Sequence, residues 1–221
     1  MTDVTLYGPR WSAYTRTAIL ALMEKGVAHE VEEVDFSGGK GMPPEHLARH
    51  PFAKVPALRH GDFWLYETSA ICRYIDAAFD GPALQPTEPK ALGRMAQIVA
   101  ILDAYLSAEI RMGYVSERLT KPLLGYQTDE ARVDRAVAAI EKGFPALEAC
   151  LADAPFMAGD TLSLADLHAA PLLGYLMLSP GGPDLVAPHP KLARWWQGIA
   201  DRPSIVATRP DLTVFQRPRD R

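Results

Sequence analysis

The sequence predicts an α/β domain followed by an all-helical domain, and three observations support this division. Residues 1–80 alternate between stretches with a two-residue hydrophobic period, typical of strands, and stretches with the 3.6-residue period of helices. Residues 81–89 are rich in proline and glycine, which is typical of a linker. Residues 90–221 show only the helical period, so the second domain is expected to contain no strands.

The first domain is predicted to begin with a strand over Val4–Tyr7 and a helix over Ala13–Lys25, which Gly26 ends. A second strand is expected over His29–Val34, before a loop rich in glycine and proline. The remaining elements are a helix over Glu45–Arg49, a hairpin of strands Ala57–Arg59 and Phe63–Tyr66, and a helix over Ala70–Phe79. This β-α-β-α-β-β-α order is the thioredoxin-like arrangement, a mixed four-stranded sheet with helices on both faces.

The helical domain is predicted to begin with a long helix that is apolar on two faces. Such a helix must contact two neighbours, and one of them could be another subunit. Further helices are expected over Asp129–Leu151 and Lys191–Asp201. The first face of the long helix carries Leu92, Met95, Val99, Leu102, Leu106 and Ile110, and the second carries Ile98, Ile101 and Tyr105.

A helix start is predicted at Ser163. Its hydroxyl can accept a hydrogen bond from the Asp166 N–H, while the Asp166 carboxylate reaches back to Ser163 in a capping box. The expected role of both residues is in folding and not in catalysis.

Composition and charge argue against several classes of function. Apolar residues make up 48% of the 221 residues and charged residues 23%, which is ordinary for a globular protein. The formal net charge is −4 and no basic stripe is present, which argues against nucleic acid as the main partner. No apolar run approaches the ~20 residues that cross a membrane. The N-terminus lacks the pattern of a signal peptide.

The cysteines and histidines predict neither a disulfide framework nor a metal site. Cys72 and Cys150 lie far apart in the sequence and form no CxxC pattern. The six histidines show no metal-ligand spacing. A reducing cytoplasm is therefore the expected location.

The segment from Lys54 to Ile71 carries the strongest functional signal. Val55-Pro56 is a candidate cis peptide, which would turn the Val55 N–H and C=O outward, where they could pair with a peptide ligand. Glu67-Thr68-Ser69 opens the next helix, whose first turn offers unpaired N–H groups and the positive end of the helix dipole. These groups suit one small, charged, peptide-like ligand.

Val55-Pro56-Ala57-Leu58, followed by Leu65-Tyr66-Glu67-Thr68-Ser69-Ala70-Ile71, resembles the glutathione-binding half of the soluble glutathione S-transferases. That family usually has Glu-Ser where this chain has Glu67-Thr68, and threonine keeps the hydroxyl. The stretch from Phe156 to Asp166 is similar to the capping-box region of the family's helical domain, so the resemblance covers nearly the whole chain. It implies a cytoplasmic homodimer in which the glutathione thiolate attacks small hydrophobic electrophiles.

The resemblance also implies a catalytic residue, Ser12. The run from Leu6 to Arg16 leads from strand to turn to helix with Ser12 at the N-cap, and it resembles the serine-type, phi- and theta-like transferases, bacterial members among them, in which this serine donates to the thiolate. The alternative is that Ser12 only caps its helix, as serine commonly does. Tyr7 and Tyr14 are rival donors, because some classes of the family use a strand-end tyrosine. The absence of a cysteine near Trp11 weighs against thiol–disulfide chemistry.

Glutathione contacts follow from the same resemblance. Val55 would pair with the cysteinyl backbone, whereas Glu67 and Thr68 would hold the γ-glutamyl amine and carboxylate. Either basic side chain, Lys40 or Lys54, could meet the glycyl carboxylate, although the family often has Gly-Gln where this chain has Ala53-Lys54. The implied glutathione-binding residues are Lys40, Lys54, Val55, Pro56, Glu67 and Thr68.

The electrophile site is expected to be apolar and to lie between the domains. Its candidate residues are Trp11, Tyr105, Met112 and Tyr114, with Phe215 from the tail, although each taken singly is more typical of a core residue than of a pocket wall. Phe52 resembles an aromatic residue that some members insert into the partner subunit, and the alternative is that it only anchors its own loop. Two alternatives stay open: another glutathione-dependent activity, such as isomerase, peroxidase or dehalogenase, and a binding protein that keeps the fold without turnover.

Overall fold

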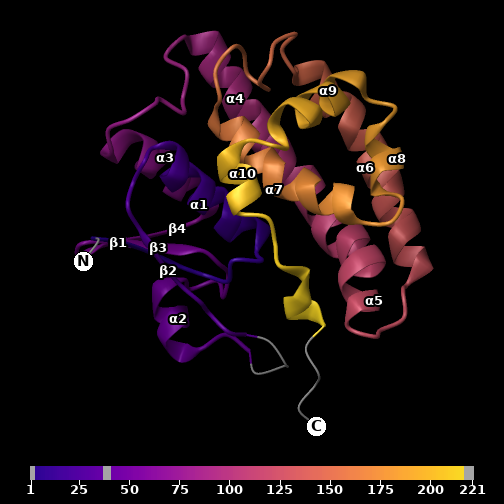
Figure 1. Ribbon diagram of the computed structural model, residues 1–221, viewed down its shortest axis with the longest axis horizontal. Helices are drawn as coiled ribbons and strands as arrows, with labels where there is room; N and C mark the ends of the chain where they lie inside the picture. The colour runs from indigo at the N-terminus through magenta and orange to yellow at the C-terminus, as the bar shows by residue number, and fades with distance from the viewer. Residues whose placement is uncertain (1–2, 37–40, 217–221) are drawn as a thin grey trace. The chain divides into compact units, whose positions relative to one another are not determined.

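The computed structural model describes residues 3–36 and 41–216 and divides into two compact units. The α/β unit comprises the described residues up to 85 together with 203–210, and the helical unit comprises 86–202 with the described residues from 211 onward (Figure 1). The sequence pattern predicts a helical domain over all of 90–221. Residues 203–210 instead belong with the α/β unit, because α10 (Pro203–Ala207) contacts α1 (Ala13–Glu24) and the Ser204 hydroxyl donates a hydrogen bond to Glu24.

The α/β unit contains a mixed four-stranded sheet in the order β2-β1-β3-β4. Strand β1 pairs in parallel with β2, and β3 pairs antiparallel with both β1 and β4. The strands are β1 (Val4–Tyr7), β2 (Glu30–Glu32), β3 (Ala57–His60) and β4 (Phe63–Tyr66). The predicted thioredoxin-like fold is confirmed, although β2 is shorter than expected.

Helices cover both faces of this sheet (Figure 1). Helices α1 and α3 (Thr68–Ala78) contact each other on one face, and α2 (Pro44–Arg49) lies on the other. A buried ion pair joins α1 to α3, because Lys25 Nζ lies 3.2 Å from Asp76 Oδ1. Asp76 also accepts a 2.8 Å hydrogen bond from the Leu84 N–H, which ties the end of the α/β unit to α3.

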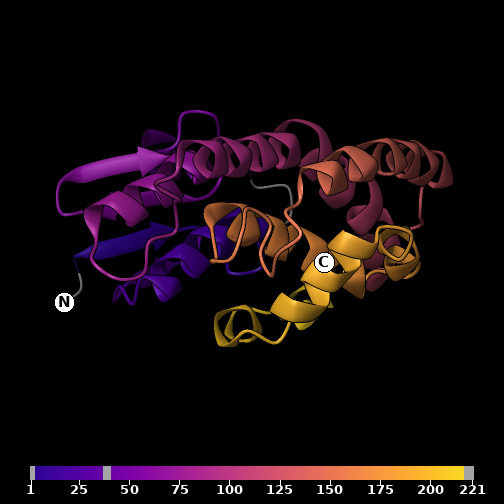
Figure 2. The ribbon, with the colours of Figure 1, turned by 90° about the horizontal axis from the view of Figure 1, so that it is seen from above.

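The secondary-structure elements assigned in the described part of the helical unit are helices (Figure 2). The predicted long helix continues beyond Ile110, and much of it is π-helical: the Ser107 N–H bonds to Leu102 O and the Lys121 N–H to Ser116 O, both five residues back. No helix in the described part of the chain has the length and apolarity needed to cross a bilayer. The elements are α4 (Pro89–Ile101), η1 (Leu102–Leu106), η2 (Glu109–Thr120), α5 (Lys121–Leu123), α6 (Glu130–Cys150), α7 (Leu164–Leu178), α8 (Gly182–Val186), α9 (Pro190–Ile199) and η3 (Leu212–Phe215).

Helix α7 is buried over nearly its whole length, and the predicted capping box at its start is present. The buried Asp166 carboxylate accepts hydrogen bonds from the Ser163 N–H and hydroxyl, both at 2.8 Å. It also accepts from the Met157 N–H at 2.9 Å and from the Trp195 indole at 2.7 Å. One carboxylate thus joins the start of α7 to the preceding loop and to α9, in agreement with a role in folding.

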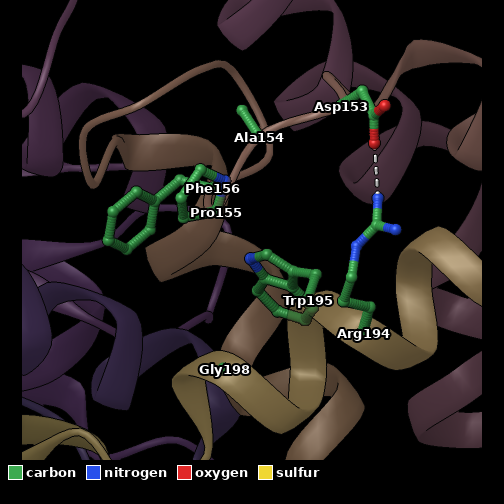
Figure 3. Close-up of a pocket in the computed structure, with 7 residues that line it drawn as sticks. All are labelled: Asp153, Ala154, Pro155, Phe156, Arg194, Trp195 and Gly198. Atoms are coloured by element: carbon green, nitrogen blue, oxygen red, sulfur yellow. Dashed lines mark hydrogen bonds and ion pairs between the residues drawn. The ribbon is translucent and has the colours of Figure 1, made fainter.

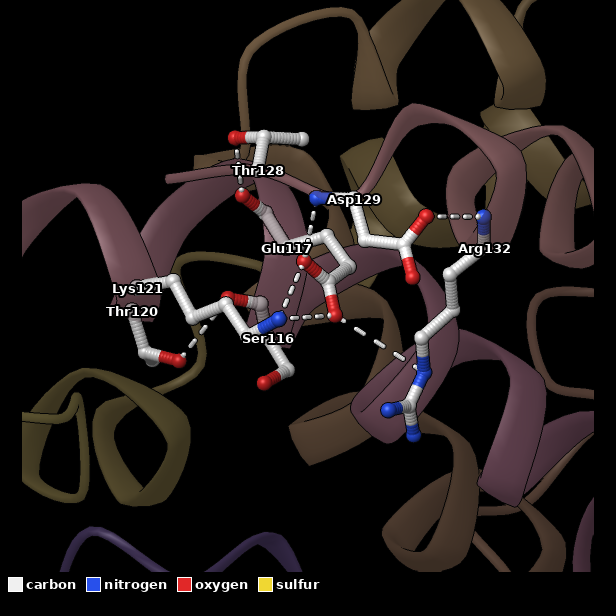
Figure 4. A network of polar contacts seen from close by, with 7 residues as sticks. All are labelled: Ser116, Glu117, Thr120, Lys121, Thr128, Asp129 and Arg132. Atoms are coloured by element: carbon white, nitrogen blue, oxygen red, sulfur yellow. Dashed lines mark hydrogen bonds and ion pairs between the residues drawn. The ribbon is translucent and has the colours of Figure 1, made fainter. Parts of the chain in front are cut away.

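A second buried carboxylate, Glu117, holds η2 to the start of α6 (Figure 4). It accepts hydrogen bonds from Lys121 Nζ at 2.7 Å and from the Asp129 N–H at 2.9 Å. Burial alone would raise its pKa, but the Asp129 N–H, Lys121 and Arg132 together outweigh burial and lower the pKa of Glu117. This network is not predictable from the sequence, because a glutamate within a helix has no distinctive local pattern.

Candidate active site

The register of the sheet brings the predicted motifs to one end of it. Tyr7 pairs with Ala57 across β1 and β3, and Ala57 pairs with Tyr66 across β3 and β4. Gly8 follows Tyr7, Pro56 precedes Ala57 and Glu67 follows Tyr66 in the sequence. The loop to α1, the Val-Pro turn and the start of α3 therefore all leave the sheet at the same end.

Ser12 is the N-cap of α1, as predicted. Its backbone is extended (φ −66°, ψ 128°), and its hydroxyl oxygen accepts a hydrogen bond from the Thr15 N–H at 3.4 Å. A serine hydroxyl that accepts one hydrogen bond still has its own proton to donate. Capping of α1 and donation to a bound thiolate are therefore compatible roles for the same hydroxyl.

Gly8 connects Ser12 to the Val-Pro turn. A Cβ atom built on Gly8 would lie 2.5 Å from Thr15 Oγ1 and 3.2 Å from Val55 Cβ. The backbone at Gly8 is thus closely surrounded by the first turn of α1 on one side and by Val55 on the other. Gly8 is not among the site residues predicted from the sequence, although a glycine between a strand and an N-cap serine was an available signal.

The Val55-Pro56 peptide bond is cis, as the sequence predicted. The Val55 side chain is half-buried and packs on a cluster formed by Tyr7, Val34 and Ala57. Ala53, just before the turn, has a φ of +53°, a conformation that alanine rarely adopts. Lys54 is exposed, whereas Lys40 lies outside the described residues.

Helix α3 begins at Thr68, two residues earlier than predicted, with Glu67 at its N-cap. Glu67 has a φ of +71°, and among the described residues no hydrogen bond from its side chain caps the helix. The first N–H groups of a helix have no intrahelical partner, and here the N-cap side chain does not supply one. Thr68 is buried and the Glu67 side chain is exposed, so an anion could meet both the helix N-terminus and a carboxylate beside it.

The two rival tyrosines lie in different surroundings. Tyr7 is 4% exposed and belongs to the core, where the Arg49 guanidinium lies 4.1 Å from the centre of its ring. Tyr14 is half-buried on α1. The core position of Tyr7 agrees with the alternative that its role is packing.

The predicted electrophile residues differ in exposure. Trp11 is half-buried, with its ring centre 5.6 Å from that of Phe36 in the α/β unit. Tyr105 is 72% exposed and Met112 49% exposed in the helical unit. Tyr114 is buried, and its hydroxyl donates to the Pro180 carbonyl at 2.9 Å, which makes it a core residue and a poor candidate for the wall of a pocket. Phe215 is half-buried in η3.

A pocket of about 400 Å³ lies within the helical unit and contains none of the predicted residues (Figure 3). Phe156 and Trp195 provide its aromatic surface, and an exposed ion pair between Arg194 and Asp153, at 2.7 Å, lies at its edge. The Trp195 indole N–H is already bonded to Asp166.

Fold and site together define a class of proteins: a thioredoxin-like domain with a hydroxyl at the start of its first helix, followed in the same chain by an all-helical domain. Residues 11–78 match the family model of the glutathione S-transferase N-terminal domain, and residues 69–203 match that of the C-terminal domain. The chain therefore belongs to the glutathione S-transferase family, and its activity is that of a glutathione transferase.

Individual relatives agree with this assignment. The chain is 37% identical to "Glutathione S-transferase 4" of Zea mays over 209 residues, which cover 91% of this chain and 89% of that protein. The solved structure of glutathione S-transferase III in its apo form has a TM-score of 0.82 at 32% identity and covers 98% of both chains. The structure of glutathione S-transferase-I bound with lactoylglutathione has a TM-score of 0.81 at 30% identity and covers 93% of this chain and 98% of that one.

Proposed function

We propose that glutathione binds at the end of the sheet where Gly8, Val55-Pro56 and Glu67-Thr68 meet, and that Ser12 stabilises its thiolate. The observation that carries this proposal is the register of β1, β3 and β4, which brings the three motifs to the same end of the sheet. The related transferase-I binds lactoylglutathione, a glutathione derivative, which supports a site for the tripeptide in this chain.

Each part of the tripeptide has a chemical counterpart in the proposal. The Val55 backbone pairs with the cysteinyl residue of glutathione in the manner of an added strand. The γ-glutamyl carboxylate meets the Thr68 hydroxyl and the open N–H groups of α3, and the γ-glutamyl amine meets the Glu67 carboxylate. The glycyl carboxylate is assigned to Lys54, with Lys40 as a second cation.

The energy needed for the thiolate is modest. A hydrogen bond to a charged acceptor contributes roughly 1.5–3 kcal/mol, and a helix N-terminus adds ~0.3–1 kcal/mol. Because one pKa unit corresponds to ~1.4 kcal/mol, together these lower a thiol pKa of ~8.5 by about one to three units. The Ser12 hydroxyl and the N-terminus of α1 can thus make the thiol mostly anionic at neutral pH without a strong base.

The remaining assignments follow from the family resemblance. We assign the chain to the serine-type, phi- or theta-like branch of the family, and we expect a bacterial origin. We also assign it to the cytoplasm. Trp11, Tyr105 and Met112 are proposed to contact a small hydrophobic electrophile. A second copy of the chain is proposed to cover the exposed aromatic patch formed by Phe52, Trp64 and Tyr66, which are 36–66% exposed.

Replacement of the Ser12 hydroxyl tests the proposal directly. In Ser12→Ala we expect the thiol pKa of bound glutathione to rise by about one to two units, because the donor to the thiolate is lost. The affinity for glutathione is expected to stay within about twofold, because the other contacts are intact. The ultraviolet absorbance of the thiolate, followed against pH, measures the first quantity, and calorimetry measures the second.

Tyr14→Phe serves as the control, since it removes the rival hydroxyl from the same helix. If the thiol pKa rises in Tyr14→Phe and not in Ser12→Ala, the donor is the tyrosine and the assignment of Ser12 is wrong.

A further inference from the structure

We propose that His46 is a positioning residue for glutathione: its imidazole holds the peptide group between Lys54 and Val55 and thereby directs the Val55 N–H toward the ligand. This inference rests on the proposed function, because it assigns to Val55 the pairing with the glutathione backbone. His46 itself is not expected to touch glutathione.

The first observation is a buried imidazole bonded to the loop. His46 is fully buried on α2, and its Nε2 lies 2.8 Å from the Lys54 carbonyl oxygen. Since a carbonyl oxygen only accepts hydrogen bonds, Nε2 carries the proton and donates it. The other ring nitrogen, Nδ1, has no hydrogen-bond partner within the described residues.

The unmatched Nδ1 atom suggests a role beyond packing. A buried polar atom without a partner destabilises the folded state, whereas an apolar side chain of similar shape at the same position would not. Helix α2 buries only this one residue. A histidine at its single buried position is thus poorly suited to stability alone but well suited to holding one carbonyl group.

The second observation is the geometry of the peptide group that His46 holds. The Lys54–Val55 bond is not among the cis bonds of the described chain, so it is trans and planar, with its C=O and N–H pointing in opposite directions. Once the Lys54 carbonyl is held against His46, the Val55 N–H must point away from α2. A ligand that pairs with Val55 as a strand would need this donor in a fixed direction.

The chain between His46 and Lys54 is folded to bring the two together. The His50 N–H bonds to the His46 carbonyl at 2.8 Å, and the Ala53 N–H bonds to the His50 carbonyl at 3.0 Å. Ala53 then takes a left-handed conformation, with a φ of +53°, which reverses the chain. An unfavourable alanine conformation is retained where the surrounding structure requires it, and here it returns the Lys54 carbonyl to His46.

Two variants test this role. His46→Phe keeps a flat ring but removes the donor, whereas His46→Gln retains an amide N–H donor at nearly the position of Nε2. In His46→Phe we expect the Kd and KM for glutathione to rise about three- to tenfold, while kcat at saturating glutathione stays within about twofold. His46→Gln is expected to restore most of the affinity. Calorimetry and steady-state kinetics measure these values, and circular dichroism checks the fold.

A matched control is His168→Phe, because His168 is also buried and its Nδ1 lies 2.7 Å from the Leu164 carbonyl within the helical unit. This variant is expected to leave the Kd for glutathione unchanged. Should His46→Phe fail to fold, His46→Asn, whose amide is shorter, is compared with His46→Gln instead.

The inference is overturned if His46→Phe binds glutathione as tightly as the wild type, or if His46→Gln is as weak as the variant without a donor. A wild-type protein that takes up no glutathione would instead contradict the proposed function itself, so the two failures are distinguishable.

Discussion

At the scale of single residues, two unusual backbone conformations flank the proposed glutathione site. Ala53 and Glu67 both have positive φ angles, which for residues other than glycine cost of order 1–3 kcal/mol. Such conformations cluster at functional sites. Ala53 turns the chain before the Val-Pro step, and Glu67 turns it into α3. The strained backbone therefore lies on the two segments that are proposed to bind the ends of the tripeptide.

Gly8 offers a test of how closely Ser12 and Val55 are linked. In Gly8→Ala the new methyl group would lie 2.5 Å from Thr15 Oγ1, so the buried Thr15 side chain or its surroundings must shift. We expect a loss of about 1–3 kcal/mol in the free energy of unfolding, together with weaker glutathione binding. Chemical denaturation and calorimetry measure the two effects.

The control for this substitution is Gly93→Ala, which makes the same chemical change within α4, where a Cβ would meet no atom within 4 Å. A helical glycine replaced by alanine should stabilise by roughly 0.5–1 kcal/mol. A Gly8→Ala protein with wild-type stability and glutathione affinity would show that the close approach of Thr15 and Val55 to Gly8 affects neither property.

At the scale of elements, buried carboxylates hold the helices together. Asp166 joins α7 to α9, Asp76 joins α3 to α1, and Glu117 joins η2 to α6. Each carboxylate is matched by donors from a different part of the chain. Breaking one side of such a pair leaves the other polar groups buried without a partner, which destabilises more than loss of an exposed pair.

The lowered pKa of Glu117 gives this network a defined dependence on pH. A carboxylate with a folded-state pKa below its ordinary value of 4.5 contributes stability above that value, and the contribution is lost as the pH falls through the folded-state pKa. Glu117→Gln should therefore lower the free energy of unfolding by about 1–3 kcal/mol at neutral pH. The difference in free energy of unfolding between the variant and the wild type should become smaller in acid. Urea unfolding at several pH values measures this difference.

Glu130→Gln is the matched control, because Glu130 pairs with Arg118 but its side chain is 63% exposed. An exposed pair is worth at most about 1 kcal/mol, so this variant should stay near the wild type at every pH. A Glu117→Gln protein that is destabilised equally at neutral and acid pH would contradict the stabilising effect expected from the lowered pKa of Glu117.

At the scale of the whole molecule, Phe52, Trp64 and Tyr66 form an exposed aromatic patch, for which a second copy of this chain is the proposed partner. Phe52 is 66% exposed, with its ring centre 6.2 Å from that of Tyr66. Contiguous apolar side chains on a protein surface commonly mark an interface with another protein. A second copy of this chain is the occupant that the family resemblance implies.

Phe52→Asp tests the proposed homodimer. A charge placed in an apolar interface has no partner and loses its hydration, so we expect the dimer to dissociate at least about tenfold more readily. Sedimentation velocity over a range of concentrations measures this. Leu178→Asp, on an exposed leucine at the end of α7, should leave the association unchanged. A wild-type protein that stays monomeric throughout, or a Phe52→Asp dimer as tight as the wild type, would contradict the proposal.

The amino-acid sequence by itself determined the order of strands and helices up to α3, the cis Val-Pro turn, the N-cap at Ser12 and the capping box at Ser163. Each of these depends on local chemistry: hydrophobic period, proline geometry, or a hydroxyl placed beside the first N–H groups of a helix. The family resemblance added the glutathione assignment, since it rests on motifs that are contiguous in the chain.

Only the tertiary structure decided the features that join distant residues. Tyr7 pairs with Ala57, and Ala57 pairs with Tyr66, through the register of the strands. Gly8 lies beside Val55, and Tyr114 is buried. Residues 203–210 belong to the α/β unit, although they follow the helical domain in the sequence. The tertiary structure also placed the His46 imidazole on the Lys54 carbonyl. Local patterns carry no information about such contacts, because they depend on strand register and on which side chains the fold removes from water.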